Sequence, residues 1–230
     1  MLTLLGVALF VALGSWQWRR GQEKAALFAA FDRGIAQAPV PLQQARGDAD
    51  GVSYPHVTVR GYYAEPAYEY ELENQVRDGR VGVMVYALFE PADGGAPLLV
   101  NRGFLAYAGG ESRYPALPPL PRDKVTLSAL YAPPPGAGLR LGGNGLAAQK
   151  FPKKMIYLDL AEISTDLDRT LDPRVLLTLP DTADGTAFVR QWRPEVFPPE
   201  RHYGYALTWF TFAAVVVATF ATLHWRKMPQ

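Results

Sequence analysis

The sequence predicts a membrane protein in which two transmembrane α-helices, one N-terminal and one C-terminal, flank a mostly β extramembrane domain that is barrel- or sandwich-like. Two uncharged apolar runs lie near the ends of the 230-residue chain, and all 22 acidic residues lie between them. Between the runs, short segments rich in β-branched and aromatic residues are typical of strands. The expected parts are a first membrane helix (2–18), a juxtamembrane helix and connector (19–52), a β domain (53–198), a second membrane helix (199–225) and a tail (226–230).

The N-terminal run, Leu2 to Trp18, has 17 residues, which is the lower limit for a membrane-spanning helix. A cleaved secretory signal is the alternative interpretation. The run lacks a positively charged segment before its apolar core, and no clear small-residue cleavage site precedes the tryptophans. We therefore favour a retained helix that continues toward Ile35.

The middle of the chain carries the strand signals. Residues 38–52 are rich in Pro, Gln, Gly and Asp, which is typical of a connector. We expect the first two strands to form a hairpin around Glu65-Pro66, and we expect Glu69, Glu71 and Glu73 to lie on the solvated face of the second. The expected strands are 56–63, 68–73, 81–89, 97–105, 124–131, 155–160, 175–179 and 187–192, with a helix over 161–171.

The C-terminal run, Tyr203 to Trp225, has 23 residues without a formal charge. As a helix it would extend roughly 34 Å at about 1.5 Å per residue, and a bilayer's hydrocarbon core is about 30 Å thick. The aromatic residues at the two ends of this run, Tyr203, Tyr205 and Trp209 at one end and Trp225 at the other, are suited to the membrane interfaces. Two spans would place both termini on one side of the membrane, with the lipid bilayer as a partner of the chain.

Charge alone leaves the topology open. Four basic residues lie between Arg19 and Arg33 after the first run, whereas only Arg226 and Lys227 follow the second. A positive-inside count would place the middle domain in the cytoplasm, but long translocated domains largely escape that rule.

Several function classes are disfavoured by what the sequence lacks. The chain has no Cys, which excludes disulfides, thiolate metal sites and cysteine nucleophiles. It contains no serine-hydrolase elbow, zinc-protease motif or Walker loop, and no clustered basic stretch suited to nucleic acid. We therefore expect a binding protein and not an enzyme.

His202 is the candidate metal ligand. It follows Pro198-Pro199-Glu200, a run suited to starting a helix, and Tyr205 and Trp209 fall along the same helical face. A neutral imidazole beside an aromatic strip could ligate a haem iron. The alternative, favoured by composition alone, is an interfacial histidine that bonds water or lipid headgroups.

On the first helix, Gln17, Arg20 and Lys24 share a face, and Trp16 lies one turn before Arg20. The two cations could hold haem propionates or an acidic partner by charge-assisted hydrogen bonds. Snorkelling to lipid phosphates is the alternative.

These residues carry a resemblance to the Surfeit locus assembly factors of cytochrome c oxidase. The chain departs from the family pattern over 133–151 and 172–186. The matching segments are Leu13-Gly14-Ser15-Trp16-Gln17-Trp18-Arg19-Arg20 with Lys24, Val59-Arg60-Gly61, Val100-Asn101-Arg102-Gly103-Phe104, Tyr157-Leu158-Asp159-Leu160 and His202-Tyr203-Gly204-Tyr205-Ala206-Leu207-Thr208-Trp209-Phe210.

The resemblance implies a two-pass protein of the bacterial inner (plasma) membrane with a periplasmic domain and cytoplasmic termini. The missing presequence before Leu2 favours a bacterial over a mitochondrial member. The implied role is that of a respiratory-chain chaperone that helps haem a reach oxidase subunit I, with haem a synthase as a further candidate partner and His202 as the haem ligand. In our hypothesis from the two helical faces, the other haem contacts are Tyr205, Trp209, Trp16, Gln17, Arg20 and Lys24.

Two other readings of the sequence stay open. One is a permanent accessory subunit of the oxidase without a cofactor role. The other is an unrecognised periplasmic enzyme, which the lack of a nucleophile, base and orienting group argues against.

Overall fold

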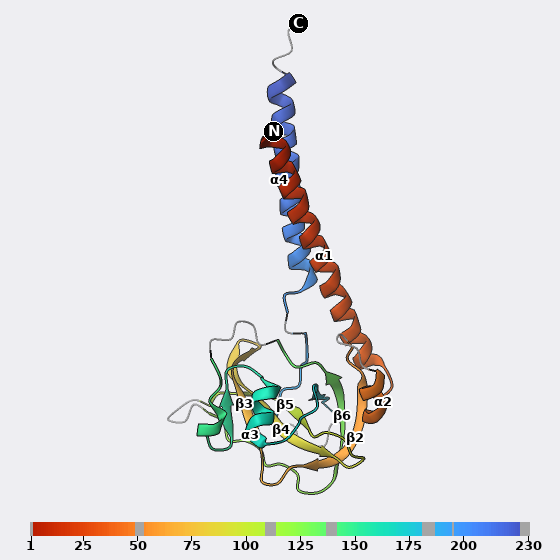
Figure 1. Cartoon of the computed structure of the whole chain (residues 1–230), viewed down its shortest axis with the longest axis vertical. Coiled ribbons are helices and arrows are strands. Elements are labelled where there is room, and N and C mark those ends of the chain that lie inside the picture. The colour runs from red at the N-terminus through yellow and green to blue at the C-terminus, as the bar shows by residue number, and fades with distance from the viewer. Residues whose placement is uncertain are drawn as a thin grey trace. The chain divides into compact units, whose positions relative to one another are not determined.

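The chain divides into two compact units. A computed structural model describes residues 2–48, 53–108, 114–136, 142–180, 187–194 and 196–225. The first unit comprises Met1–Ala29 with Pro194–Gln230, and the second comprises Ala30–Arg193. Helix α4 (Pro199–Trp225) belongs to the first unit, as does helix α1 (Leu2–Ala36) up to Ala29. The second unit is a β domain (Figure 1).

The centre of the β domain is a closed five-stranded barrel. Strand β4 pairs back onto β2, so the sheet closes on itself. Closure satisfies the backbone groups that an open sheet would leave along its edges. Of the two expected architectures, the domain is therefore a barrel and not a sandwich. The barrel strands, in spatial order, are β2 (His56–Tyr63), β6 (Val125–Ala132), β8 (Val175–Thr178), β5 (Leu98–Ala106) and β4 (Arg80–Pro91).

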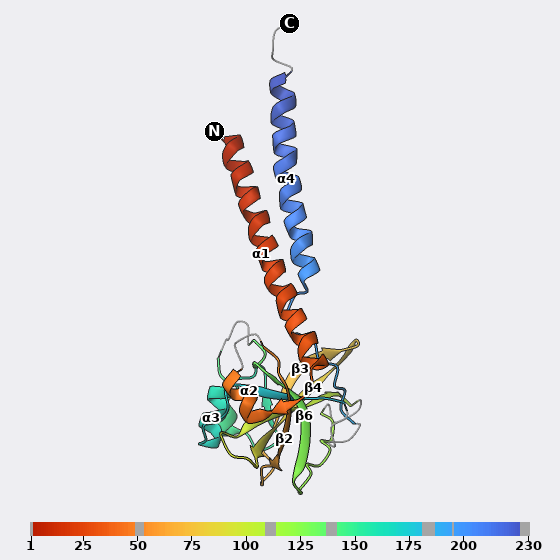
Figure 2. The ribbon, with the colours of Figure 1, turned by 90° about the vertical axis from the view of Figure 1, so that its right-hand side faces the viewer.

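Further elements lie on the outside of this barrel (Figures 1 and 2). Strand β3 (Glu69–Arg77) pairs with β4, and β7 (Lys153–Met155) pairs with β3. Strand β1 (Val40–Pro41) pairs with β2 and leads directly into helix α2 (Leu42–Asp48). The remaining elements are the 3-10 turn η1 (Leu146–Ala148) and helix α3 (Leu160–Leu167).

The side chains of β2 alternate between buried and exposed, and the buried ones belong to the barrel core. Val57, Val59 and Tyr63 are buried, whereas Thr58 and Arg60 are exposed. The buried side chains join residues of β4, β5, β6 and β8 in one core cluster. Each fully buried aliphatic side chain contributes about 1.5–3 kcal/mol relative to solvent exposure, so the period of two is sufficient to specify which face of β2 turns inward.

The expected hairpin between the first two strands is wrong. Strand β2 pairs with β6 and β4, while β3 forms its hairpin with β4. That hairpin turns at Asp78-Gly79, whose φ angles are 49° and 74°. An Asp-Gly pair with positive φ is strongly favoured in a two-residue hairpin turn, and this local signal determines the partner of β3.

The expected solvated face of β3 is also wrong. Glu71 is only 1% exposed and forms an ion pair with Lys154, whose pKa burial lowers from its usual value. Glu69 forms an ion pair with Arg102 at 2.8 Å. Strand β7 and neighbouring loops cover this face, and the two carboxylates pair with the half-buried Lys154 and the buried Arg102.

Two further expectations are corrected. The connector over 38–52 contains β1 and α2, and α2 is anchored by Arg46, whose Nε donates to Asp172 at 2.7 Å.

The strand expected over 155–160 ends at Met155, and Leu160 already begins α3. The side chain of Asp159 accepts hydrogen bonds from the first turn of α3, as a helix N-cap does. The other expected strands coincide with β4, β5, β6 and β8, but residues 187–192 form only an isolated bridge through Val189.

We predict that Arg102→Met lowers the free energy of unfolding by about 3–5 kcal/mol, because it leaves a largely buried carboxylate without its cation. Arg102 is fully buried, and it donates to Glu69 and to the carbonyl of Pro118 at 2.9 Å. Denaturant unfolding of the full chain in detergent, followed by near-UV circular dichroism, measures the loss.

Arg169→Met is the matched control, because Arg169 pairs with Glu90 at 2.6 Å while both side chains are 40% or more exposed. Such pairs contribute about 0–1 kcal/mol. Equal losses for the two variants would contradict the structural role assigned to Arg102.

Candidate functional site

The two helices of the first unit pack closely at two glycines. A Cβ atom at Gly14 would lie 2.6 Å from the ring of Phe210, and one at Gly21 would lie 2.5 Å from the ring of Tyr203. Gly14 and Gly21 are two helical turns apart and therefore share a face. In Figures 1 and 2, α4 and the unit's part of α1 run side by side in opposite directions. Small residues allow this close approach.

A hydrogen bond between the helices lies at this contact. Gln17 falls between the two glycines on α1, and its Oε1 lies 2.9 Å from Nδ1 of His202. An amide oxygen only accepts, so Nδ1 carries the proton and the lone pair of the neutral ring is on Nε2. Among the described residues, no group is hydrogen-bonded to Nε2. The pair therefore offers a half-buried, oriented imidazole nitrogen that can bind a metal.

Aromatic side chains line one flank of the helix pair. We call the group Trp18, Tyr203 and Phe210 the Trp18 flank. The rings of Trp18 and Tyr203 are 5.0 Å apart. A hollow of about 460 Å³ lies here, lined by Ser15, Trp18, Arg19 and Phe210. The Trp18 flank thus combines flat apolar surfaces with one cation, which suits an amphipathic ring system.

The opposite flank carries other residues that the sequence singled out. Two residues along a helix correspond to a rotation of about 200°. Trp16 therefore points away from Trp18 on α1, and Tyr205 points away from Tyr203 on α4. We call Trp16, Arg20 and Tyr205 the Trp16 flank. Trp16 is 49% exposed and Tyr205 is 59% exposed. Arg20 forms an exposed ion pair with Glu23 at 2.7 Å.

The structure therefore brings together only part of the predicted site. Gln17 contacts His202 directly. Lys24 is half-buried. Trp209 stacks on Phe10 of α1, with ring centroids 5.8 Å apart, so its ring is already engaged within the helix pair.

Sequence reasoning assigned no haem-site role to Trp18, Arg19, Tyr203 or Phe210. The glycines at positions 14 and 21, spaced by seven, were the available signal for a close contact.

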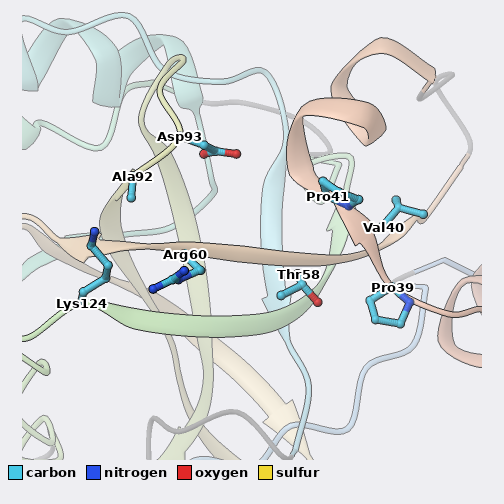
Figure 3. Close-up of a pocket in the computed structure, with 8 residues that line it drawn as sticks. All are labelled: Pro39, Val40, Pro41, Thr58, Arg60, Ala92, Asp93 and Lys124. Atoms are coloured by element: carbon cyan, nitrogen blue, oxygen red, sulfur yellow. The ribbon is translucent and has the colours of Figure 1, made fainter.

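A second hollow lies on the outside of the barrel (Figure 3). It measures about 540 Å³, and Figure 3 shows the cationic side chains of Arg60 and Lys124 at one end, with Pro39 and Pro41 at the other. Its lining offers charges but no histidine. Within the described part of the chain, no group of three or more His, Cys, Asp or Glu is placed to hold a metal ion. The helix pair is therefore the better candidate for a metal-containing ligand.

Comparison with known proteins identifies one family. The model of the SURF1 family matches residues 4–214, a range that includes Gly14, Gln17, Gly21 and His202. No curated protein matches the chain.

We predict that Gly14→Leu and Gly21→Leu each separate the helices, because the added side chains would overlap the rings of Phe210 and Tyr203. Such overpacking typically costs about 1–3 kcal/mol. The chain lacks cysteine, so Phe10→Cys and Phe212→Cys, whose native rings are 5.7 Å apart, provide a defined pair for a short bis-maleimide cross-linker. Cross-linking in bilayers should fall in both glycine variants.

Gly6→Leu is the control, because a Cβ at Gly6 would meet nothing within 4 Å. Unchanged cross-linking in all three variants would show that the glycines do not determine the packing of the helix pair.

Proposed function

The chain belongs to the SURF1 family, and we propose that it is a two-span membrane assembly factor that helps deliver haem a to subunit I of cytochrome c oxidase. The family is generally linked to cytochrome oxidase assembly. The observation that carries the haem step is the hydrogen bond between Gln17 and His202, because it leaves Nε2 as the metal-binding atom.

The proposed membrane placement rests on the composition of α4 and on the exposed apolar side chains of α1. Among the described residues, α4 is the one helix long and apolar enough to cross a membrane by itself. We propose α1 as the second span, supported by the exposed side chains of Leu4, Leu5 and Leu9 and by its close packing on α4. In this proposal the protein lies in the bacterial inner membrane, with its barrel in the periplasm and both termini in the cytoplasm.

When bound, haem a would supply an iron that takes an imidazole ligand. In the proposal, Nε2 of His202 is that ligand, and Gln17 orients the ring and fixes its tautomer. The Trp18 flank contacts the macrocycle, and Arg19 lies where a propionate can be bound by charge-assisted hydrogen bonds. The Trp16 flank, with Arg20 and Lys24, is the competing surface for the same ring.

The proposed partners follow from this role. Haem a must be accepted from a donor, for which haem a synthase is the candidate, and must pass to oxidase subunit I. The open hollow on the Trp18 flank supports such an exchange, because a ligand there would have one face toward the surroundings. The barrel would contact these partners outside the membrane.

We predict that the chain purified from cells that make haem a carries a haem a signal in its reduced-minus-oxidised spectrum, and that His202→Ala removes it because Nε2 is lost. His224→Ala is the matched control. His224 lies in the last turn of the same helix, where its Nδ1 bonds the carbonyl of Phe220, and the signal should persist.

Trp18→Ala and Trp16→Ala in the same assay identify the flank that holds the ring. If unmodified protein carries no haem yet remains bound to the mature oxidase in stoichiometric amount, the chain is a permanent accessory subunit instead.

We predict that Gln17→Leu weakens haem binding by about 10- to 100-fold, as is typical when the hydrogen-bond partner of a metal-bound histidine is lost. Gln17→Glu should retain haem with a lower reduction potential, because a carboxylate acceptor makes the imidazole a stronger donor to iron. Equilibrium haem titration and redox titration measure the two effects. An unchanged potential in the glutamate variant would contradict contact between this pair and the iron.

A further inference from the structure

The hollow in Figure 3 is built entirely from residues of the second unit, on the outside of the barrel. We call it the Arg60 hollow. Its floor is the outward face of β2, where Thr58 and Arg60 lie two residues apart and are both exposed. Side chains two residues apart on a strand point to the same face. The hydroxyl group and the guanidinium group therefore project from the same side of the sheet.

Two segments form the walls of the Arg60 hollow, and hydrogen bonds hold both in place. On one side, Pro41 of β1 pairs with β2. On the other side, the backbone N–H of Ala92, just after β4, donates to the carbonyl of Arg60 at 2.7 Å. The walls are also bonded to each other, because Gln43 of α2 donates to the carbonyl of Gly94 at 2.8 Å. The hollow is therefore formed before a ligand arrives, which reduces the entropy cost of binding.

The two cations of the Arg60 hollow have no carboxylate partner. Among the residues that the structure describes, none forms an ion pair with Arg60 or Lys124. The ammonium group of Lys124 lies 5.2 Å from the centre of the Tyr62 ring, and Tyr62 is on the same outward face of β2 as Arg60. Two available cations on a preformed surface attract an anionic ligand.

The other end of the Arg60 hollow is apolar. Figure 3 shows Pro39 and Pro41 there, at the end away from Lys124. Proline has no backbone N–H to donate, so this end can contact carbon groups but cannot hold an anion. A phosphate or another small anion would use only the cationic end. A ligand that fills this hollow of about 540 Å³ therefore carries an acidic group and an apolar group.

An extended protein segment provides that combination. Its side chains recur on one face roughly every 7 Å, so a carboxylate can meet Arg60 while an apolar side chain two residues away meets the prolines. Arg60 can bind the carboxylate through two parallel hydrogen bonds, and Lys124 adds a second positive charge. Asp93 lines the hollow from the β4–β5 turn, where it repels a second carboxylate. The charges thus favour one orientation of the segment.

We propose that the Arg60 hollow is a docking site for an extended acidic segment of a partner protein, with an acidic and an apolar residue two positions apart. The acidic side chain binds Arg60 and Lys124, and the apolar side chain packs on Pro39 and Pro41. All the lining residues belong to the second unit. Docking therefore requires neither haem binding nor the membrane placement proposed above.

Full-length protein in nanodiscs of neutral phospholipid tests the proposal with a rhodamine-labelled peptide in which glutamate alternates with leucine. Fluorescence anisotropy should show saturable binding, which a peptide with glutamine in place of glutamate should lack. Arg60→Glu and Lys124→Glu should each weaken binding about tenfold or more, because repulsion replaces attraction at the carboxylate. Asp93→Asn should strengthen binding about two- to fivefold, because an exposed like charge is removed.

Arg80→Glu is the matched control, because it makes the same change of charge at the start of β4, whereas the Arg60 hollow lies beyond the other end of that strand. Its binding should be unchanged, and near-UV circular dichroism verifies that each variant is folded. Equal losses in all three glutamate variants would overturn the proposal, since they would show attraction to net charge alone.

Three further results would also overturn the docking site. One is the absence of saturable peptide binding to the unmodified protein. Another is displacement of the peptide by an equal concentration of inorganic phosphate, which would indicate a simple anion site. The third is binding to vesicles of anionic phospholipid that depends on Arg60 and Lys124 while the peptide does not bind, which would assign the hollow to lipid.

Discussion

The close approach of the two helices at Gly14 and Gly21 is the constraint on which the candidate site depends. A side chain at either position would overlap an aromatic ring of α4. Only at this separation can the amide of Gln17 reach the ring of His202 at 2.9 Å. The glycines thus act on the imidazole without touching it. They set the distance, the distance permits the hydrogen bond, and the hydrogen bond determines which ring nitrogen keeps its lone pair.

The barrel uses buried charge for a different purpose, which is to join segments that are distant in sequence. Arg46 of α2 donates to Asp172, and Tyr131 of β6 donates to the other carboxylate oxygen at 2.7 Å. Arg102 joins β5 to Glu69 of β3. Removing one partner of such a network leaves an unpaired buried charge, which is costly. The Asn-Arg-Gly-Phe motif around Arg102 therefore acts as a structural support of the barrel and needs no ligand to explain it.

The sequence predicts correctly those strands and helices that are determined by residues close to them in the chain. The apolar run of β4, the alternation of β2 and the helix after Asp159 all follow from their own residues. The pairing of β2 with β6 and the burial of Glu71 do not, because they depend on strands more than sixty residues away. The site shows the same division. Periodicity placed Gln17 on a face with Arg20, whereas the contact with His202 depends on the register of two helices at opposite ends of the chain.

The chemistry of Gln17 suits the temporary hold that the proposed function requires. A carboxylate acceptor would pull the Nδ1 proton strongly and make the ring a better ligand for iron, whereas a neutral amide orients the ring with a weaker effect on its basicity. A factor that passes haem onward must bind it less tightly than the receiving protein does, since transfer proceeds toward the site of higher affinity. A half-buried histidine, an amide partner and an open aromatic flank would orient the haem without binding it tightly, which is the balance that the proposed transfer requires.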